Sequence, residues 1–426
     1  MDNSSLKQRL ERLDCHFTWD LECSTNELQN FLRKLEYLDQ KTCTWLVHYY
    51  NLLGYIHQTL GSNTEAVKHL HKAESVIQEQ GTEEAGAQFL VNKANLACVY
   101  FHLGDMDKSK GYLEEVERLQ RMHPAPPGCT LHPEVSGEKG WTLVKLNKSN
   151  KCQAVDYFKM ALNAEPDRKE WHKGLAIAMN AEFGSEFTPD EIVQQLKIAN
   201  EKEPNSLFIY SHWLKLCKEK NVNIEKEMQG LFERTLETGN LECLHVILRY
   251  FSEQDFDKGI QKAKEAHEKF PSSAKVLKQL ADCYKWKVYK MADSEERETL
   301  ARESIKLYEK DLTYNPDSYK LKIDIASLHC YTHEIEKADE IYNNLLSEEN
   351  DSSPHKQQYI FYNYAQHLNH NKLQTRDSVP FYMKAAEIPV SGCKQKSIRF
   401  LQNIVRRGTD PRCVEIRHFL NGINSD

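Results

Sequence analysis

Small and large apolar residues recur along this chain at fixed steps, and this recurrence limits its fold more than any other feature. In one clear case Gly54 is followed after 12 residues by Ala66, after four more by Leu70 and after three more by Ala73. Steps of three and four place side chains on one face of a helix. The pattern therefore predicts a pair of helices that pack closely where both carry small residues.

The same 12, 4 and 3 steps return elsewhere in the chain. They run through Ala97, Ser109, Leu113 and Val116, and again through Ala326, Ala338, Tyr342 and Leu345. This spacing is typical of the tetratricopeptide repeat, whose helix pairs stack on one another and bury a continuous core. We therefore predict an all-α fold, a tetratricopeptide-repeat superhelix (α-solenoid) of about eight helix pairs with helical insertions.

The composition agrees with long helices joined by short loops, since the 426 residues include only 17 Gly and 13 Pro. A charged insertion, 292–302, is expected to displace the second helix of its pair. The Pro- and Gly-rich stretch 123–128 is the best linker candidate. We divide the chain into residues 1–135 with the N-terminal helices and first repeats, residues 136–240 with the central repeats, and residues 241–426 with the last repeats and capping helices.

No catalytic motif stands in the sequence. It lacks a P-loop, a dinucleotide-binding glycine loop, a zinc-binding HExxH and a serine nucleophile elbow. The 12 cysteines are scattered without a CxxC pair, which is typical of reduced cytosolic thiols and predicts no metal site. The chain has neither a signal peptide nor a run of 18 apolar residues. We therefore expect a cytosolic binding protein rather than an enzyme, with no cofactor and no membrane contact.

The first helix of each pair should line the inner wall of the superhelix, where a ligand would bind. A clamp for a peptide carboxylate needs Lys and Asn around the small residues of successive first helices. This chain has Asn51, Tyr55, Ala94 and Cys98 at those places, so that clamp is missing. Single-stranded nucleic acid needs aromatic platforms and cations instead. Because the net charge is −7, any such site must be a local basic patch.

Three places in the sequence combine aromatic and basic residues. Trp141 and Lys145 lie four residues apart and therefore on one helix face. A second cluster interleaves Lys278, Gln279, Lys285, Lys287 and Lys290 with Trp286 and Tyr289, and a third pairs Arg249 with Tyr250. The first place is the strongest RNA-binding candidate, because it opens the helix pair that continues through Phe158.

Each of these residues also has a plainer explanation. Trp141 fits a core position, and Lys145 fits a solvated surface. Tyr250 stands where the repeat places an ordinary core tyrosine, and residues 285–290 fit a solvated helix face. Composition alone therefore favours a protein-binding scaffold over an RNA-binding protein.

Several longer motifs, taken in order, resemble one known family. They are Cys15–Trp19 (CHFTW), Tyr50–Tyr55 (YNLLGY), Val99–Gly104 (VYFHLG), Glu138–Lys145 (EKGWTLVK), Gly174–Ala178 (GLAIA), Lys278–Gln279 and Cys283–Lys285. On these residues the chain is identified as a divergent or shortened member of the interferon-induced proteins with tetratricopeptide repeats. The resemblance runs from about residue 6 to about residue 390, and it is strongest before residue 180.

This resemblance implies an innate-immune antiviral effector in the cytosol. Such a protein grips the 5′ end of foreign single-stranded RNA, triphosphorylated or capped, in a basic groove and sequesters it from translation. It further implies that Trp141 faces the RNA end, that Lys145 contacts phosphate and that Gln279 lies on the RNA path. Other family members, or signalling and translation proteins, are further possible partners. The alternative is a protein–protein adaptor in antiviral signalling that does not bind RNA.

The sequence departs from the family pattern at four charged or polar positions. A family Arg that helps to hold the 5′ phosphates falls at Ala181, while a family Gln, Tyr and His fall at Lys34, Lys151 and Lys278. One cation is lost and three are gained, so we expect a basic pocket with a different arrangement, and the choice between triphosphate and cap stays open. The RNA-binding candidates are Trp141, Lys145, Lys34, Lys151, Arg249, Tyr250, Lys278, Gln279 and Lys285.

Overall fold

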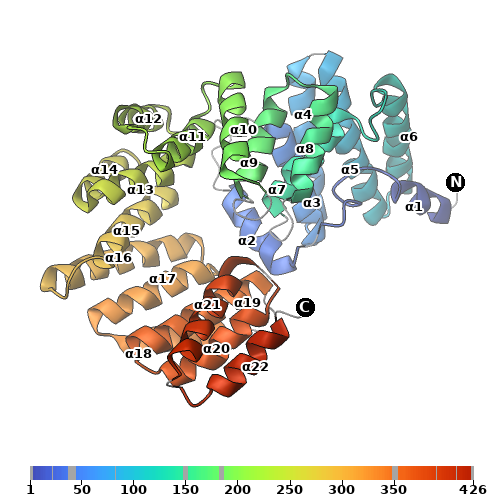
Figure 1. Ribbon diagram of the computed structural model, residues 1–426. Helices are drawn as coiled ribbons and strands as arrows, with labels where there is room; N and C mark the ends of the chain where they lie inside the picture. The colour runs from blue at the N-terminus through green and yellow to red at the C-terminus, as the bar shows by residue number, and fades with distance from the viewer. Residues whose placement is uncertain are drawn as a thin grey trace. The chain divides into compact units, whose positions relative to one another are not determined.

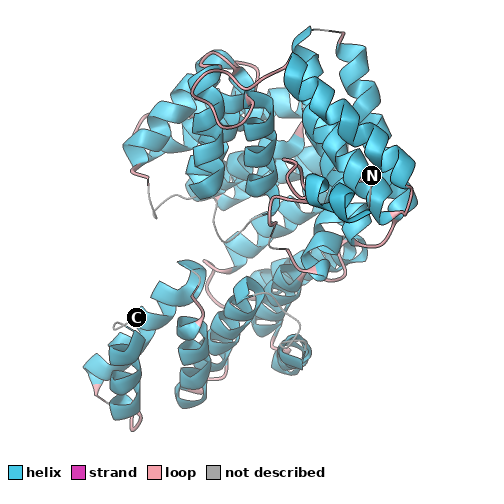
Figure 2. Cartoon of the chain, turned by 90° about the vertical axis from the view of Figure 1, so that its right-hand side faces the viewer, coloured by secondary structure: helices cyan, strands magenta, loops and turns pink. Residues whose placement is uncertain are grey.

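The computed structural model describes residues 3–21, 23–36, 45–81, 83–146, 152–181, 187–347, 354–389, 391–408 and 410–423. Every regular element in these ranges is a helix (Figures 1 and 2). The predicted all-α tetratricopeptide architecture is confirmed. None of the helices described is long and apolar enough to cross a membrane.

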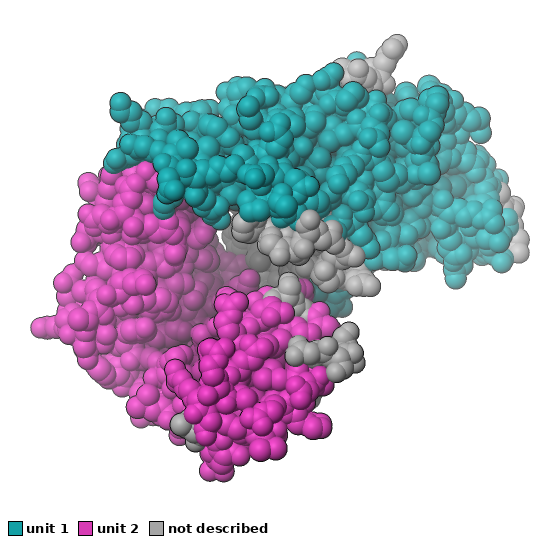
Figure 3. All heavy atoms as spheres, viewed as in Figure 1, with its two compact units in different colours: residues 1–243 teal, residues 244–426 magenta. Residues whose placement is uncertain are grey.

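The chain forms two compact units, residues 1–243 and 244–426 (Figure 3). The three-part division at residues 135 and 240 stays a prediction. The expected linker, 123–128, lies inside the first unit, where it belongs to the loop between two helices.

In the first unit, successive helices pair and each pair packs on the next. The helices are α1 (Asn3–Leu10), α2 (Thr25–Glu36), α3 (Leu46–Thr59), α4 (Asn63–Gln80), η2 (Glu83–Gln88), α5 (Phe89–His102), α6 (Met106–Met122), α7 (Pro133–Leu146), α8 (Cys152–Ala164), α9 (Lys169–Ala181), α10 (Pro189–Lys202), α11 (Leu207–Glu219), α12 (Glu225–Thr238) and η3 (Leu241–Cys243). Contacts between α3 and α7, and between α1 and both α5 and α6, add cross-links beyond neighbouring pairs.

The second unit repeats the arrangement. Its helices are α13 (Leu244–Gln254), α14 (Phe256–Lys269), α15 (Ala274–Val288), α16 (Glu295–Tyr314), α17 (Tyr319–His329), η4 (Cys330–Thr332), α18 (Ile335–Ser347), α19 (Pro354–Gln366), η6 (His367–Asn371), α20 (Thr375–Glu387), α21 (Ser391–Arg407) and α22 (Cys413–Ile423). The last two helices pack on each other and on α19 and α20, as expected for capping helices.

The small residues of the repeat are required by close packing between the two helices of a pair. A Cβ atom on Gly54 would lie 2.5 Å from Cγ of Leu70. Between pairs, a Cβ on Gly174 of α9 would lie 2.2 Å from Cε1 of Phe158 on α8. Both distances are too short for real atoms, so these helices approach only because glycine is present.

Helix ends follow local sequence signals. Thr188 caps α10 with its side-chain oxygen, which accepts the backbone N–H of Glu191, and the Glu191 carboxylate accepts the N–H of Thr188 in return. Pro189 occupies the first turn, where no helical donor is needed. Gly81 and Gly239 end α4 and α12 in the left-handed conformation, with φ of 61° and 69°.

Most of the charged insertion, 292–302, becomes part of the second helix of its pair. Ser294 accepts the backbone N–H of Arg297 and starts α16 inside the insertion. The inserted residues therefore lengthen α16 to 20 residues, because they are rich in Glu and Arg, which favour helix.

Candidate nucleic-acid interface

Trp141 lies on α7 with its indole in the core of the first unit. It is only 5% exposed. Its ring meets Phe158 edge-on, with centroids 5.4 Å apart. On another side it lies parallel to the half-buried ring of Trp45, at a centroid distance of 6.4 Å and an interplanar angle of 4°. Trp141 is therefore a core residue that also forms one half of an aromatic pair.

Lys145 completes this group one helical turn further along α7. Its Nζ atom lies 4.9 Å from the centre of the Trp45 ring, within the range of a cation–π contact. Trp45, Trp141 and Lys145 form what we term the tryptophan site. Trp45 was missed in the sequence because it stands just before α3 and outside the quoted family motifs. The one sequence feature that could have indicated it is a tryptophan directly before the first helix of a repeat.

Polar side chains are buried beneath the tryptophan site, where α3, α5 and α7 meet. The Asn51 amide donates to a carboxylate oxygen of Glu138 at 2.8 Å, and Asn92 donates to the Asn51 oxygen at 2.9 Å. His48 forms an ion pair with Glu138 at 3.4 Å. One carboxylate thus ties α7 to α3, and through Asn51 to α5.

Opposite charge decides the ionisation of this pair. Burial, the largest single effect, would lower the pKa of His48, but the charge and hydrogen bond of Glu138, together with the charges of Glu134 and Glu170, outweigh it and the pKa is raised. Burial, again the largest single effect, would raise the pKa of Glu138, but the charge of His48 and the hydrogen bonds from His48 and Asn51, with a smaller contribution from His16, outweigh it and the pKa is lowered. Both groups are therefore charged near pH 6.

His16 joins the same core from the segment after α1. The Asn95 amide lies 3.1 Å from Nδ1 of His16, and Thr142 Oγ1 lies 3.0 Å from Nε2. Burial lowers the pKa of His16 to about 4, so the ring is neutral at pH 7. The amide nitrogen of Asn95 can only donate, so Nδ1 accepts and Nε2–H donates to Thr142, which fixes the tautomer.

A further acid stands one turn earlier on α7. Burial raises the pKa of Glu134 to about 7, although the Arg168 guanidinium lies only 2.7 Å from its carboxylate. Both buried acids of α7, Glu134 and Glu138, thus have an internal basic partner. Their charges are therefore offset locally, within the core.

In the second unit, acids engage the lysines of the predicted cluster. Lys278 pairs with Asp282 at 2.7 Å, and buried Lys285 reaches Asp282 at 3.1 Å and Asp324 at 3.0 Å. Burial alone would lower the pKa of Lys285, but the two carboxylates raise it. Gln279 is buried and lies 3.1 Å from Nδ1 of His245. Lys278 and Lys285 are thus neutralised by carboxylates in the described structure.

Arg249 is the more exposed member of the third candidate. Its guanidinium stacks over Trp286 with Cζ 4.8 Å from the ring centre, and Nε donates to Glu253 at 2.6 Å. Tyr250 is buried with its ring edge-on to Phe251, the place that the repeat gives to a core tyrosine.

The remaining predicted positions fall at or beyond the limits of the described residues. Lys34 lies on α2 and Ala181 at the end of α9, and the side chains of both are outside the described set. Lys151 is itself outside the described residues. The structure thus places Trp141 and Lys145 together in the first unit and Arg249, Tyr250, Lys278, Gln279 and Lys285 in the second.

Comparison with known proteins agrees with the repeat assignment. The tetratricopeptide repeat profile matches residues 47–79 and 93–121. The antiviral innate immune response effector IFIT1 of Macaca fascicularis is 26% identical over 95% of this chain and 88% of that protein. Interferon-induced protein with tetratricopeptide repeats 2 of Homo sapiens is 25% identical over 99% of this chain and 93% of that protein.

The chain is similar to the interferon-induced proteins with tetratricopeptide repeats. The resemblance expected from the motifs is thereby confirmed along nearly the whole chain. Solved structures of the human family member IFIT1 share the fold. The dimer with PPP-AAAA superposes with a TM-score of 0.73 at 24% identity over 99% of this chain and 96% of that chain. The dimer with m7Gppp-AAAA gives 0.73 at 23% identity over 99% and 100%.

Proposed function

We propose that this protein binds the 5′ end of foreign single-stranded RNA, triphosphorylated or capped, as an antiviral effector. The tryptophan site is the observation that carries the proposal. Aromatic faces bind bases and ammonium groups bind phosphates. Trp45, Trp141 and Lys145 offer both within one group of side chains. Sequestration of the bound RNA from translation, in the cytosol, follows as the proposed consequence.

The parallel rings support recognition of a planar base. Stacked bases lie about 3.4 Å apart, so a base between two rings needs ring planes separated by about 6.8 Å. The rings of Trp45 and Trp141 are within 4° of parallel, with centroids 6.4 Å apart. Because Trp141 is buried, half-buried Trp45 would have to move outward for a base to stack between the rings. A methylated guanine also carries positive charge, which the two indole faces would attract.

The relatives support the same proposed function. The family is named for interferon induction, and its IFIT1 members are named antiviral innate immune response effectors. Solved IFIT1 structures hold a short RNA with a triphosphate or a methylated cap. These are properties of the relatives, and they come to this protein as a proposal through the shared fold and the tryptophan site.

The second-unit candidates remain proposed contacts along the RNA body. Arg249 is the most accessible of them, with a side chain 49% exposed. Lys278 and Lys285 already pair with carboxylates, so a phosphate would have to displace Asp282 or Asp324. We therefore expect Lys278 and Lys285 to contribute to affinity only where a phosphate displaces these acids.

One binding assay tests the proposal. A fluorescently labelled RNA of fixed sequence is prepared with a 5′-triphosphate, a methylated cap or a 5′-hydroxyl, and its anisotropy is measured at two salt concentrations. We expect one or both modified ends to bind more tightly than the hydroxyl, and log K to fall as log salt rises. Equal and weak binding of all three RNAs would contradict the proposal and favour the protein adaptor.

A further inference from the structure

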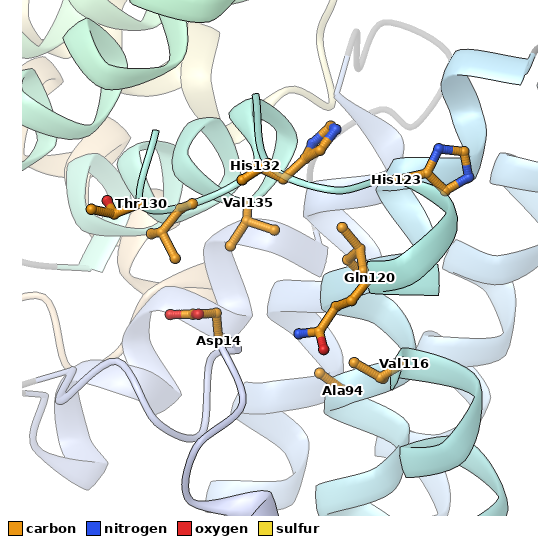
Figure 4. Close-up of a pocket in the computed structure, with 11 residues that line it drawn as sticks. Asp14, Ala94, Val116, Gln120, His123, Thr130, His132 and Val135 are labelled. Carbon is orange, nitrogen blue, oxygen red and sulfur yellow. The ribbon is translucent and has the colours of Figure 1, made fainter. Parts of the chain in front are cut away.

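A cavity opens in the first unit away from the tryptophan site, between α5, α6 and the loop that leads into α7 (Figure 4). Its volume is about 130 Å³. The floor is apolar and buried, formed by Leu90, Ala94, Val116 and Val135. Gln120 and Thr130, whose side chains are exposed, also line the cavity. The lining therefore combines buried apolar side chains with polar ones.

Asp14 supplies the only carboxylate among the residues that line this cavity, and no lysine or arginine lines it. Figure 4 shows Asp14 and Gln120 on two sides of the space below Val135. Among the described residues, no group donates a hydrogen bond to the Asp14 side chain. Burial raises the pKa of Asp14 against the opposing charge of Lys139.

Lys139 does not neutralise this carboxylate by direct contact. Its ammonium is held over the rings of Tyr157 and Trp19, with Nζ 4.6 Å and 5.9 Å from their centres. The Asp14 carboxylate is half-buried and keeps contact with solvent. A cation that enters the cavity would therefore gain a charge-assisted hydrogen bond that the protein leaves open.

The rest of the lining disfavours an anion. Burial, and then the nearby His123, lower the pKa of His132 to about 4. Nδ1 of His132 also accepts the backbone N–H of Glu134 at 3.2 Å. His132 is thus neutral at pH 7, and Asp14 would repel a phosphate. The cavity is therefore unsuited to the RNA that the tryptophan site would bind.

The volume of the cavity fits one side chain rather than a drug-sized ligand. Pockets for drug-sized ligands span roughly 300–1,000 Å³, well above the 130 Å³ available. A lysine side chain would lay its four methylenes on the apolar floor. Its ammonium has three donors, and Asp14, Gln120 and Thr130 are three acceptors in the lining. A polyamine would gain little more, because its second charge would find no second carboxylate.

We propose that this cavity is a docking site for one lysine side chain of a partner protein. The proposal is independent of RNA binding, because it uses neither Trp45, Trp141 nor Lys145.

The test uses the full chain with isotope-labelled Leu and Val methyl groups. N-acetyl-lysine methylamide is titrated in and followed by NMR, with the norleucine analogue as the probe that lacks the ammonium. We expect saturable shifts at Val116 and Val135, none at Val379 in the second unit, and at least tenfold weaker binding of norleucine. Asp14→Asn should weaken lysine binding at least tenfold.

Asp20→Asn is the matched control, because Asp20 is an exposed acid of the same segment and Asn tolerates its φ of 49°. It should bind the lysine probe as the unchanged chain does. Ala94→Leu should block binding by filling the floor, with folding checked by circular dichroism. Equal shifts with norleucine, or full affinity in Asp14→Asn, would overturn the proposal. Asp14→Asn should bind capped RNA as the unchanged chain does. A failure of the lysine-docking proposal can therefore be told apart from a failure of the RNA-binding proposal.

Discussion

At the residue scale, the spacing of Trp141 in the sequence allowed either a core position or an RNA-facing one. The structure places its side chain in the core. Truncating an aromatic core residue costs about 3–5 kcal/mol. We therefore expect Trp141→Ala to lower the free energy of unfolding by about that amount, measured by denaturant titration. A variant as stable as the unchanged protein would show that the indole does not pack as described.

Trp45 is the cleaner probe of RNA recognition, since its ring is half-buried. Stacking on an aromatic ring is worth about 1–3 kcal/mol per base. We expect Trp45→Ala to weaken binding of capped RNA about ten- to hundredfold, with a much smaller loss of stability than Trp141→Ala. Binding of the 5′-hydroxyl RNA is the internal control and should change little. An unchanged affinity for the capped RNA would remove Trp45 from the site.

His48 gives a pH dependence whose sign is fixed by its environment. Its pKa is raised in the folded protein, because Glu138, Glu134 and Glu170 together overcome the effect of burial. The stability that it adds is therefore complete below its unfolded pKa and is lost as pH rises through the folded pKa. We expect His48→Gln to lower the melting temperature more at pH 6 than at pH 8.5. The reverse order would mean that the ring is neutral in the fold.

At the scale of elements, glycines have opposite roles on different helices. A Cβ on Gly174 would collide with Phe158, whereas a Cβ on Gly111 of α6 would meet nothing within 4 Å. We expect Gly174→Ala to destabilise the first unit by about 1–3 kcal/mol, the range for overpacking. Gly111→Ala should instead stabilise it by about 0.5–1 kcal/mol. Thermal melts of the two variants check this, and equal shifts in one direction would contradict it.

The helix pairs could be predicted from sequence because their signal is local. The steps from Gly54 to Ala73 fix which faces meet, and all four of those residues are buried. The candidate site could be predicted only in part. Trp45 pairs with Trp141 across nearly a hundred residues, and no local period marks that contact. The pairing of Lys285 with Asp324 was hidden for the same reason, because the acid comes from the next helix pair.

At the scale of the whole molecule, a net charge of −7 works against RNA binding except where cations gather. Reversing the charge of one lysine that contacts a phosphate should reduce the slope of log K against log salt by about one. We expect Lys145→Glu to weaken the binding of triphosphate RNA and to lower the slope of log K against log salt by that amount. Lys110→Glu on α6, an exposed lysine outside the site, is the matched control. Equal slopes for the two variants would place the phosphates elsewhere.

The segment around His16 has a consequence for synthesis on the ribosome. Helix pairs can form as they emerge, because each packs mainly on its neighbour. His16, however, needs Thr142, which follows it by 126 residues. At about 5–20 residues per second, that partner arrives roughly 6–25 s later. The segment around His16, among the first residues to leave the ribosome, thus completes its contacts only after α7 has emerged.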